Sequence, residues 1–77
     1  MHIEVWIGDQ WQRVTRLSGN KPYEPPADVS QGDDLANGFQ MFLMNNPGDF
    51  WVQTTANPHA VYFGRWVPRL FRLVPVG

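Results

Sequence analysis

The chain lacks most of the residues from which metal centres and cross-links are built. It has no cysteine, which excludes disulfides and thiolate metal sites and is consistent with a reducing compartment such as the cytoplasm. His2 and His59 are the only histidines, and neither has acidic residues at ligand spacing around it, so we expect no metal ion and no cofactor.

Long apolar runs are also missing. No segment approaches the roughly 18 apolar residues of a membrane span. The first residues, Met1-His2-Ile3-Glu4, lack the basic region and the apolar stretch of a signal peptide. The sequence therefore predicts a soluble cytoplasmic protein that does not enter a membrane.

Groups that carry catalysis are equally sparse. No serine or threonine stands in a nucleophile-elbow motif, and the glycines do not form a phosphate-binding loop. The adjacent Asp33 and Asp34 fit the start of a helix better than an acid and base pair. We therefore expect a protein that is not an enzyme.

Aromatic residues, by contrast, are plentiful. The 77 residues include four Trp, five Phe and two Tyr, and each such ring can bury about 150–250 Å². A chain this short has room for one core, so residues 1–77 are predicted to form a single domain stabilised by these rings.

Charge is unevenly distributed along the chain. Residues 24–50 contain five acidic and no basic residues, whereas residues 51–77 contain three arginines and no acid. The folded protein could present an acidic and a basic face to partners, or the two signs could pair across the fold.

The N-terminus has the pattern of a β-hairpin. Residues 2–7 alternate between apolar and polar, Gly8-Asp9 suits a two-residue turn, and residues 10–17 supply the second strand. The side chains expected to face the core are Ile3, Val5 and Ile7.

A proline-rich loop over residues 18–32 is predicted to precede a helix from about Asp33 to Met44. Ser30 with Asp33 resembles a capping box, and Gly38 should weaken the helix by about 1 kcal/mol relative to alanine. The next two residues, Asn45-Asn46, suit a left-handed cap. The apolar stripe consists of Leu35, Phe39, Phe42 and Leu43.

The remaining segment reads as strands. Residues 50–55 and 60–66 are predicted to pair, and residues 67–74 suit either a helical turn beginning at Pro68 or another strand. We expect one turn followed by a closing strand at about residues 72–76. The fold class is thus α+β: a mostly antiparallel sheet, made of the N-terminal hairpin and the C-terminal strands, packed on one helix.

Two groups of residues are candidates for binding. Because side chains alternate along a strand, Trp6 is expected on the face opposite Ile3, and Trp11 flanks the same turn. The residues predicted to contact a protein partner are therefore Trp6, Trp11 and Arg13. Equally, the two tryptophans could fold onto the proline loop around Pro25 and Pro26.

The second group lies in the basic C-terminal third. Arginines interleaved with aromatic rings are typical of single-strand nucleic-acid binders, although the isoelectric point of about 6.0 opposes long-range attraction to phosphate. The candidate contacts are Arg65, Trp66, Arg69 and Arg72.

From Pro47 onward the chain resembles short bacteriophage-encoded proteins with a Pro-Gly-Asp-aromatic turn and no assigned activity. The matching residues are Pro47, Gly48, Asp49, Phe50, Trp51, Val52, Tyr62, Pro68, Leu70 and Phe71. The resemblance implies a phage origin and a small mixed fold. In this turn, Gly48 can supply a positive φ angle.

These observations together predict a phage accessory protein that binds and modulates a host protein. A small nucleic-acid-binding module and a phage structural or assembly component are the alternatives.

Overall fold

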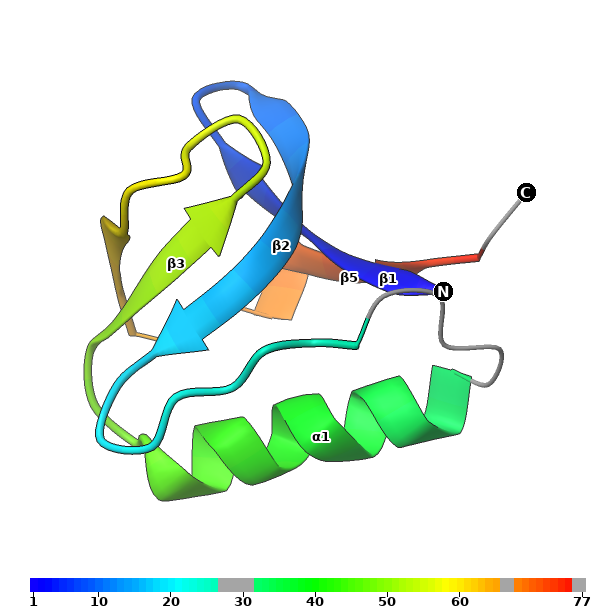
Figure 1. Ribbon diagram of the computed structural model, residues 1–77, viewed down its shortest axis with the longest axis vertical. Helices are drawn as coiled ribbons and strands as arrows, with labels where there is room; N and C mark the ends of the chain where they lie inside the picture. Colours follow the sequence, from blue (N-terminus) through cyan, green and yellow to red (C-terminus); the bar gives the residue numbers. More distant parts are fainter. Residues whose placement is uncertain (27–31, 66–67, 76–77) are drawn as a thin grey trace.

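A computed structural model describes residues 1–26, 32–65 and 68–75, which form an antiparallel five-stranded sheet packed on a helix (Figure 1). The predicted α+β class is therefore confirmed. The elements in chain order are β1 (His2–Ile7), β2 (Gln10–Ser18), α1 (Gly32–Asn45), β3 (Phe50–Thr54), β4 (Val61–Gly64), the 3₁₀ helix η1 (Pro68–Leu70) and β5 (Phe71–Val74).

The strands lie in the order β4-β3-β2-β1-β5. Strand β2 belongs to two pairings, since its first half bonds to β1 and its second half to β3. The register shifts between Val14 and Arg16 where these halves meet. Such a bulge bends a strand and increases its twist, which lets β2 turn the corner between β1 and β3.

The N-terminal hairpin is confirmed, and so is its turn. Gly8 and Asp9 have φ angles of 61° and 62°, the left-handed pair that a two-residue turn of type I′ requires. Glycine adopts this conformation freely, and aspartate is among the few other residues that tolerate it.

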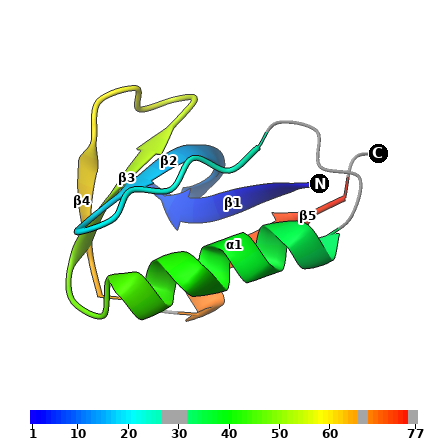
Figure 2. The same cartoon turned by 60° about the horizontal axis from the view of Figure 1, so that its bottom comes forward.

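Helix α1 covers one face of the sheet, as both views show (Figures 1 and 2). Its predicted stripe is buried there, with Leu43 at the edge. Phe42 meets Phe50 edge to face at 5.5 Å between ring centroids, and Phe39 meets Phe71 at 5.1 Å. Among the side chains that the structure describes, the buried hydrophobic core contains Ile3, Val5, Val14, Leu17, Leu35, Phe39, Phe42, Phe50 and Val52.

The segment between β2 and α1 is tied to both. The backbone of Tyr23 exchanges two hydrogen bonds of 2.8 Å with Leu17, and its ring lies against the helix at Gly38. A Cβ atom at position 38 would lie only 2.8 Å from Cζ of Tyr23. Gly38 therefore admits the tyrosine ring, which explains a residue that sequence reasoning treated only as a weakness of the helix.

The end of α1 differs from the prediction. Neither Asn45 nor Asn46 has a positive φ angle, so the expected left-handed cap is wrong. Instead, Asn46 is buried, and its amide group donates to the carbonyls of Phe42 and Lys21 and accepts from the Lys21 backbone N–H. A side chain thus joins the helix end to the preceding loop.

Other boundaries shift slightly. Gly48 does not have a positive φ angle either, so the Pro-Gly-Asp turn does not depend on glycine's conformational freedom. Ser18 ends β2 rather than opening the loop, β3 ends at Thr54, and β4 spans only Val61–Gly64. The turn at Pro68 and the closing strand are confirmed, with the strand at Phe71–Val74. Ser30 of the expected capping box lies outside the described residues.

Candidate interaction surface

The face of the sheet opposite α1 carries the side chains of interest. In β1, Ile3 and Val5 are buried in the core, so His2, Glu4 and Trp6 point to the other side. The register places Arg13 and Trp11 of β2 opposite Glu4 and Trp6, and Arg72 of β5 opposite Glu4 on its other flank. We call Glu4, Trp6, Trp11 and Arg72 the outer cluster.

The two tryptophans form its apolar part. Their ring centroids lie 5.5 Å apart with an interplanar angle of 69°, an edge-to-face pair immediately beside the turn. Trp6 remains 39% exposed, and Trp11 is half-buried. Such ring pairs contribute about 0.5–1.5 kcal/mol beyond their burial. The sequence had left open whether these rings would cover the prolines, and the structure pairs them with each other.

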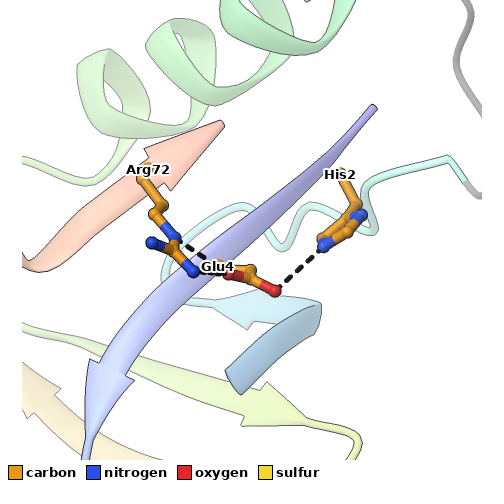
Figure 3. Close-up of polar contacts among 3 residues, drawn as sticks. All are labelled: His2, Glu4 and Arg72. Carbon is orange, nitrogen blue, oxygen red and sulfur yellow. Dashed lines mark hydrogen bonds and ion pairs between the residues drawn. The ribbon is translucent and has the colours of Figure 1, made fainter. Parts of the chain in front are cut away.

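Arg72 joins the charged and the apolar parts of the outer cluster. Its guanidinium carbon lies 4.1 Å from the centre of a Trp11 ring, within range of a cation–π interaction. Both Nε and one terminal nitrogen of Arg72 donate to Oε1 of Glu4, at 2.9 and 2.6 Å (Figure 3). One arginine from the last strand therefore supports a carboxylate of the first strand and a tryptophan of the second.

Glu4 is also bonded on its other oxygen. His2 Nε2 lies 3.0 Å from Oε2 of Glu4 (Figure 3). The hydrogen bond with His2, and then the bond and charge of Arg72, lower the pKa of Glu4 below its usual 4.5, against an opposing effect of burial. Glu4 is consequently held as a carboxylate between two partners.

Of the predicted nucleic-acid contacts, Arg65 lies at the opposite edge of the sheet from Arg72. Arg65 follows β4 and Arg69 lies in η1, both exposed, while β4 and β5 are at opposite edges of the sheet. Trp66 lies outside the described residues. Arg72 instead belongs to the outer cluster, beside residues that the sequence assigned to a protein-binding surface.

Arg13, the cross-strand neighbour of Glu4, lines a hollow of about 280 Å³. The prolines of the β2–α1 loop line this hollow together with Arg13. Its lining residues are His2, Arg13, Val14, Thr15, Pro25, Pro26 and Thr55.

A second hollow of about 460 Å³ lies between β2, β3 and the end of α1. Trp51, 46% exposed, stands at its side. Sequence reasoning placed Glu4 on the face opposite Ile3 but missed Trp51 as a surface feature. Alternation would have found Trp51, because its neighbours Phe50 and Val52 are buried and leave it on the outer face.

The part of the chain that the structure describes contains no group of three or more metal-ligating side chains. It also contains no helix long and apolar enough to cross a membrane. No protein-family model, curated protein or solved structure matches the sequence. The outer cluster is therefore interpreted from its own geometry.

Proposed function

We propose that this protein is a non-enzymatic binding module that recognises another protein through the outer cluster and Arg13. The observation that carries the proposal is the edge-to-face Trp6–Trp11 pair, in which Trp6 is exposed and Trp11 half-buried, on the sheet face opposite α1. Tryptophan and arginine are the residues most enriched among those that dominate binding energy at protein interfaces.

The rings are also held in place before any partner arrives. Each tryptophan is packed against the other, and Trp11 is further fixed by Arg72, which Glu4 binds through two hydrogen bonds. Ordering flexible side chains costs about 0.5–1.5 kcal/mol each on association. A surface whose side chains are already ordered avoids much of that cost.

The core supplies a second argument. Ile3 and Val5 are almost completely buried under α1, whereas Trp6, on the same strand, faces the other way and keeps 39% of its surface exposed. Trp6 therefore adds little to the core, and a binding role accounts for its exposed ring better than stability does.

Within the outer cluster itself, charge favours a protein over nucleic acid as the partner. The positive charge of Arg72 is balanced by Glu4 at 2.6 Å, so the cluster is apolar with a neutralised ion pair at its edge. Nucleic-acid affinity depends instead on unneutralised cations that displace counterions. The resemblance to phage-encoded proteins supports a bacterial host protein as the class of partner.

The test is affinity capture from a bacterial lysate, run with and without nuclease, on three immobilised chains: wild type, Trp6→Ala and Met44→Ala. Met44 is a matched control, because it is an exposed apolar side chain on α1. A protein retained by wild type and Met44→Ala but lost with Trp6→Ala is then purified and titrated by calorimetry. We expect Trp6→Ala to weaken its binding by about 2 kcal/mol, roughly 30-fold, with little change in melting temperature.

Three results would contradict the proposal. Equal capture by all three chains would place the interface elsewhere. Capture that disappears when nuclease is added would indicate nucleic acid, the alternative function. If Trp6→Ala lowers the melting temperature steeply, Trp6 is part of the core and the argument from its exposure fails.

A further inference from the structure

Beyond the tryptophan pair, we propose that the hollow beside Arg13 is an oxyanion-binding site that accepts a carboxylate or a phosphoryl group. The wall of the hollow combines two groups that can carry positive charge, His2 and Arg13, with the hydroxyls of Thr15 and Thr55. Guanidinium, imidazolium and hydroxyl groups are all hydrogen-bond donors to anionic oxygens.

The charge of Arg13 is not paired with any of the residues that the structure describes. Glu4 is the cross-strand neighbour of both Arg13 and Arg72, and it bonds to Arg72. Arg16, on the same strand, lies 3.8 Å from the carboxylate of Glu24. The side chain of Arg13 has neither an ion pair nor a hydrogen bond with the described residues, although it is half-buried. A half-buried guanidinium without an anion points to a ligand that supplies one.

The surroundings of Arg13 also favour the binding of an anion. Pro25 and Pro26 have no backbone N–H and present rigid apolar surface, which lowers the local dielectric constant and strengthens charge–charge attraction. Glu4, the cross-strand neighbour of Arg13, is occupied on both oxygens by Arg72 and His2. The charge of the Glu4 carboxylate is therefore already compensated by these two partners.

Size limits the ligand. Pockets for whole small molecules typically measure about 300–1,000 Å³, and this hollow is slightly smaller at about 280 Å³. It is suited to a single anionic group with a short stem and not to a complete cofactor.

The site is tested with free ions, so its outcome does not depend on the protein partner proposed above. Sodium phosphate, sodium acetate and, as a control, sodium chloride are titrated into ¹⁵N-labelled protein at constant ionic strength. We expect saturable NMR shifts of the backbone amides of Arg13, Thr15 and Thr55 and of the Arg13 Nε–H. Saturation by phosphate alone assigns the site to phosphoryl groups, and saturation by acetate assigns it to carboxylates.

Matched variants decide whether Arg13 is responsible. Arg13→Gln should weaken binding about tenfold or more, since a charge-assisted hydrogen bond is lost. Arg16→Gln should leave binding unchanged, because that arginine lies on the same strand but not in the hollow. The proposal is overturned if neither anion gives saturable shifts, if chloride gives the same shifts, or if Arg13→Gln binds as tightly as the wild type.

Discussion

Replacing Gly38 by alanine tests how the β2–α1 loop is packed. In an ordinary helix this change stabilises by about 1 kcal/mol, because alanine loses less backbone entropy on folding. Here the added methyl group would lie 2.8 and 3.0 Å from Cζ and Cε1 of Tyr23, and closer still to its hydroxyl oxygen. The ring cannot simply withdraw, since two backbone hydrogen bonds fix Tyr23 to Leu17.

The magnitude follows from two opposing effects. Forcing a methyl group into a packed site costs about 1–3 kcal/mol, which offsets or exceeds the helical gain. Gly38→Ala should therefore leave the free energy of unfolding unchanged or lower it by up to about 2 kcal/mol. In a Tyr23→Leu background, where the far end of the ring is missing, the same change should stabilise by about 0.5–1 kcal/mol.

Urea unfolding followed by tryptophan fluorescence gives all four free energies of this double-mutant cycle. Gly48→Ala is the matched control, because a Cβ atom at position 48 meets no atom within 4 Å and the φ angle is not positive. This control should be neutral or stabilising in both backgrounds. The reasoning is refuted if Gly38→Ala stabilises the wild type as much as it stabilises the Tyr23→Leu chain.

Two further changes test the core and the outer cluster. Phe42 is 2% exposed and packs on Phe50, so Phe42→Ala should lower the free energy of unfolding by about 3–5 kcal/mol and abolish most of the cooperative unfolding transition. A nearly unchanged transition would contradict the assignment of Phe42 to the core. Glu4 has a lowered pKa, so the stability that it contributes is present above pH 4.5 and is lost as the pH falls through the folded-state value. The difference in thermal stability between wild type and Glu4→Gln should thus shrink between pH 6 and about pH 3, whereas Glu24→Gln, an exposed control, should show little difference at either pH.

Much of the fold could be predicted because its signals are local. The alternation of residues 2–7, the Gly8-Asp9 turn and the apolar stripe of α1 each act within a few residues. They identified the hairpin and the helix almost at their observed boundaries. The face on which Trp6 lies followed from the same alternation.

Features that depend on distant segments could not be predicted. The role of Gly38 becomes apparent only when the ring of Tyr23 is placed beside it, and Asn46 ends the helix by bonding to Lys21. Propensity alone suggested a weak helix position and a left-handed cap. In both cases tertiary contacts determined the outcome, and the local preference was overridden.

The candidate site likewise combines residues that local sequence patterns predicted with residues that distant segments contribute. Hairpin geometry predicted that Trp6 and Trp11 are cross-strand neighbours, as the structure shows, but Arg72 is 68 positions away from Glu4 along the chain. Nothing in the sequence states that β5 pairs with β1 and not with another strand. The C-terminal arginines therefore looked like one group, although the structure places Arg72 in the outer cluster and Arg65 beyond the opposite edge strand.

This pairing links the proposed binding surface to completion of the fold. The outer cluster takes residues from β1, β2 and β5, so it exists only when both the N-terminal hairpin and the closing strand are in place. The isolated hairpin would still bring Trp6 and Trp11 together, but without the Arg72 guanidinium on Trp11 or the ion pair with Glu4. A partner that requires the ordered rings would accordingly bind the complete domain more tightly than the hairpin alone, because the closing strand supplies their support.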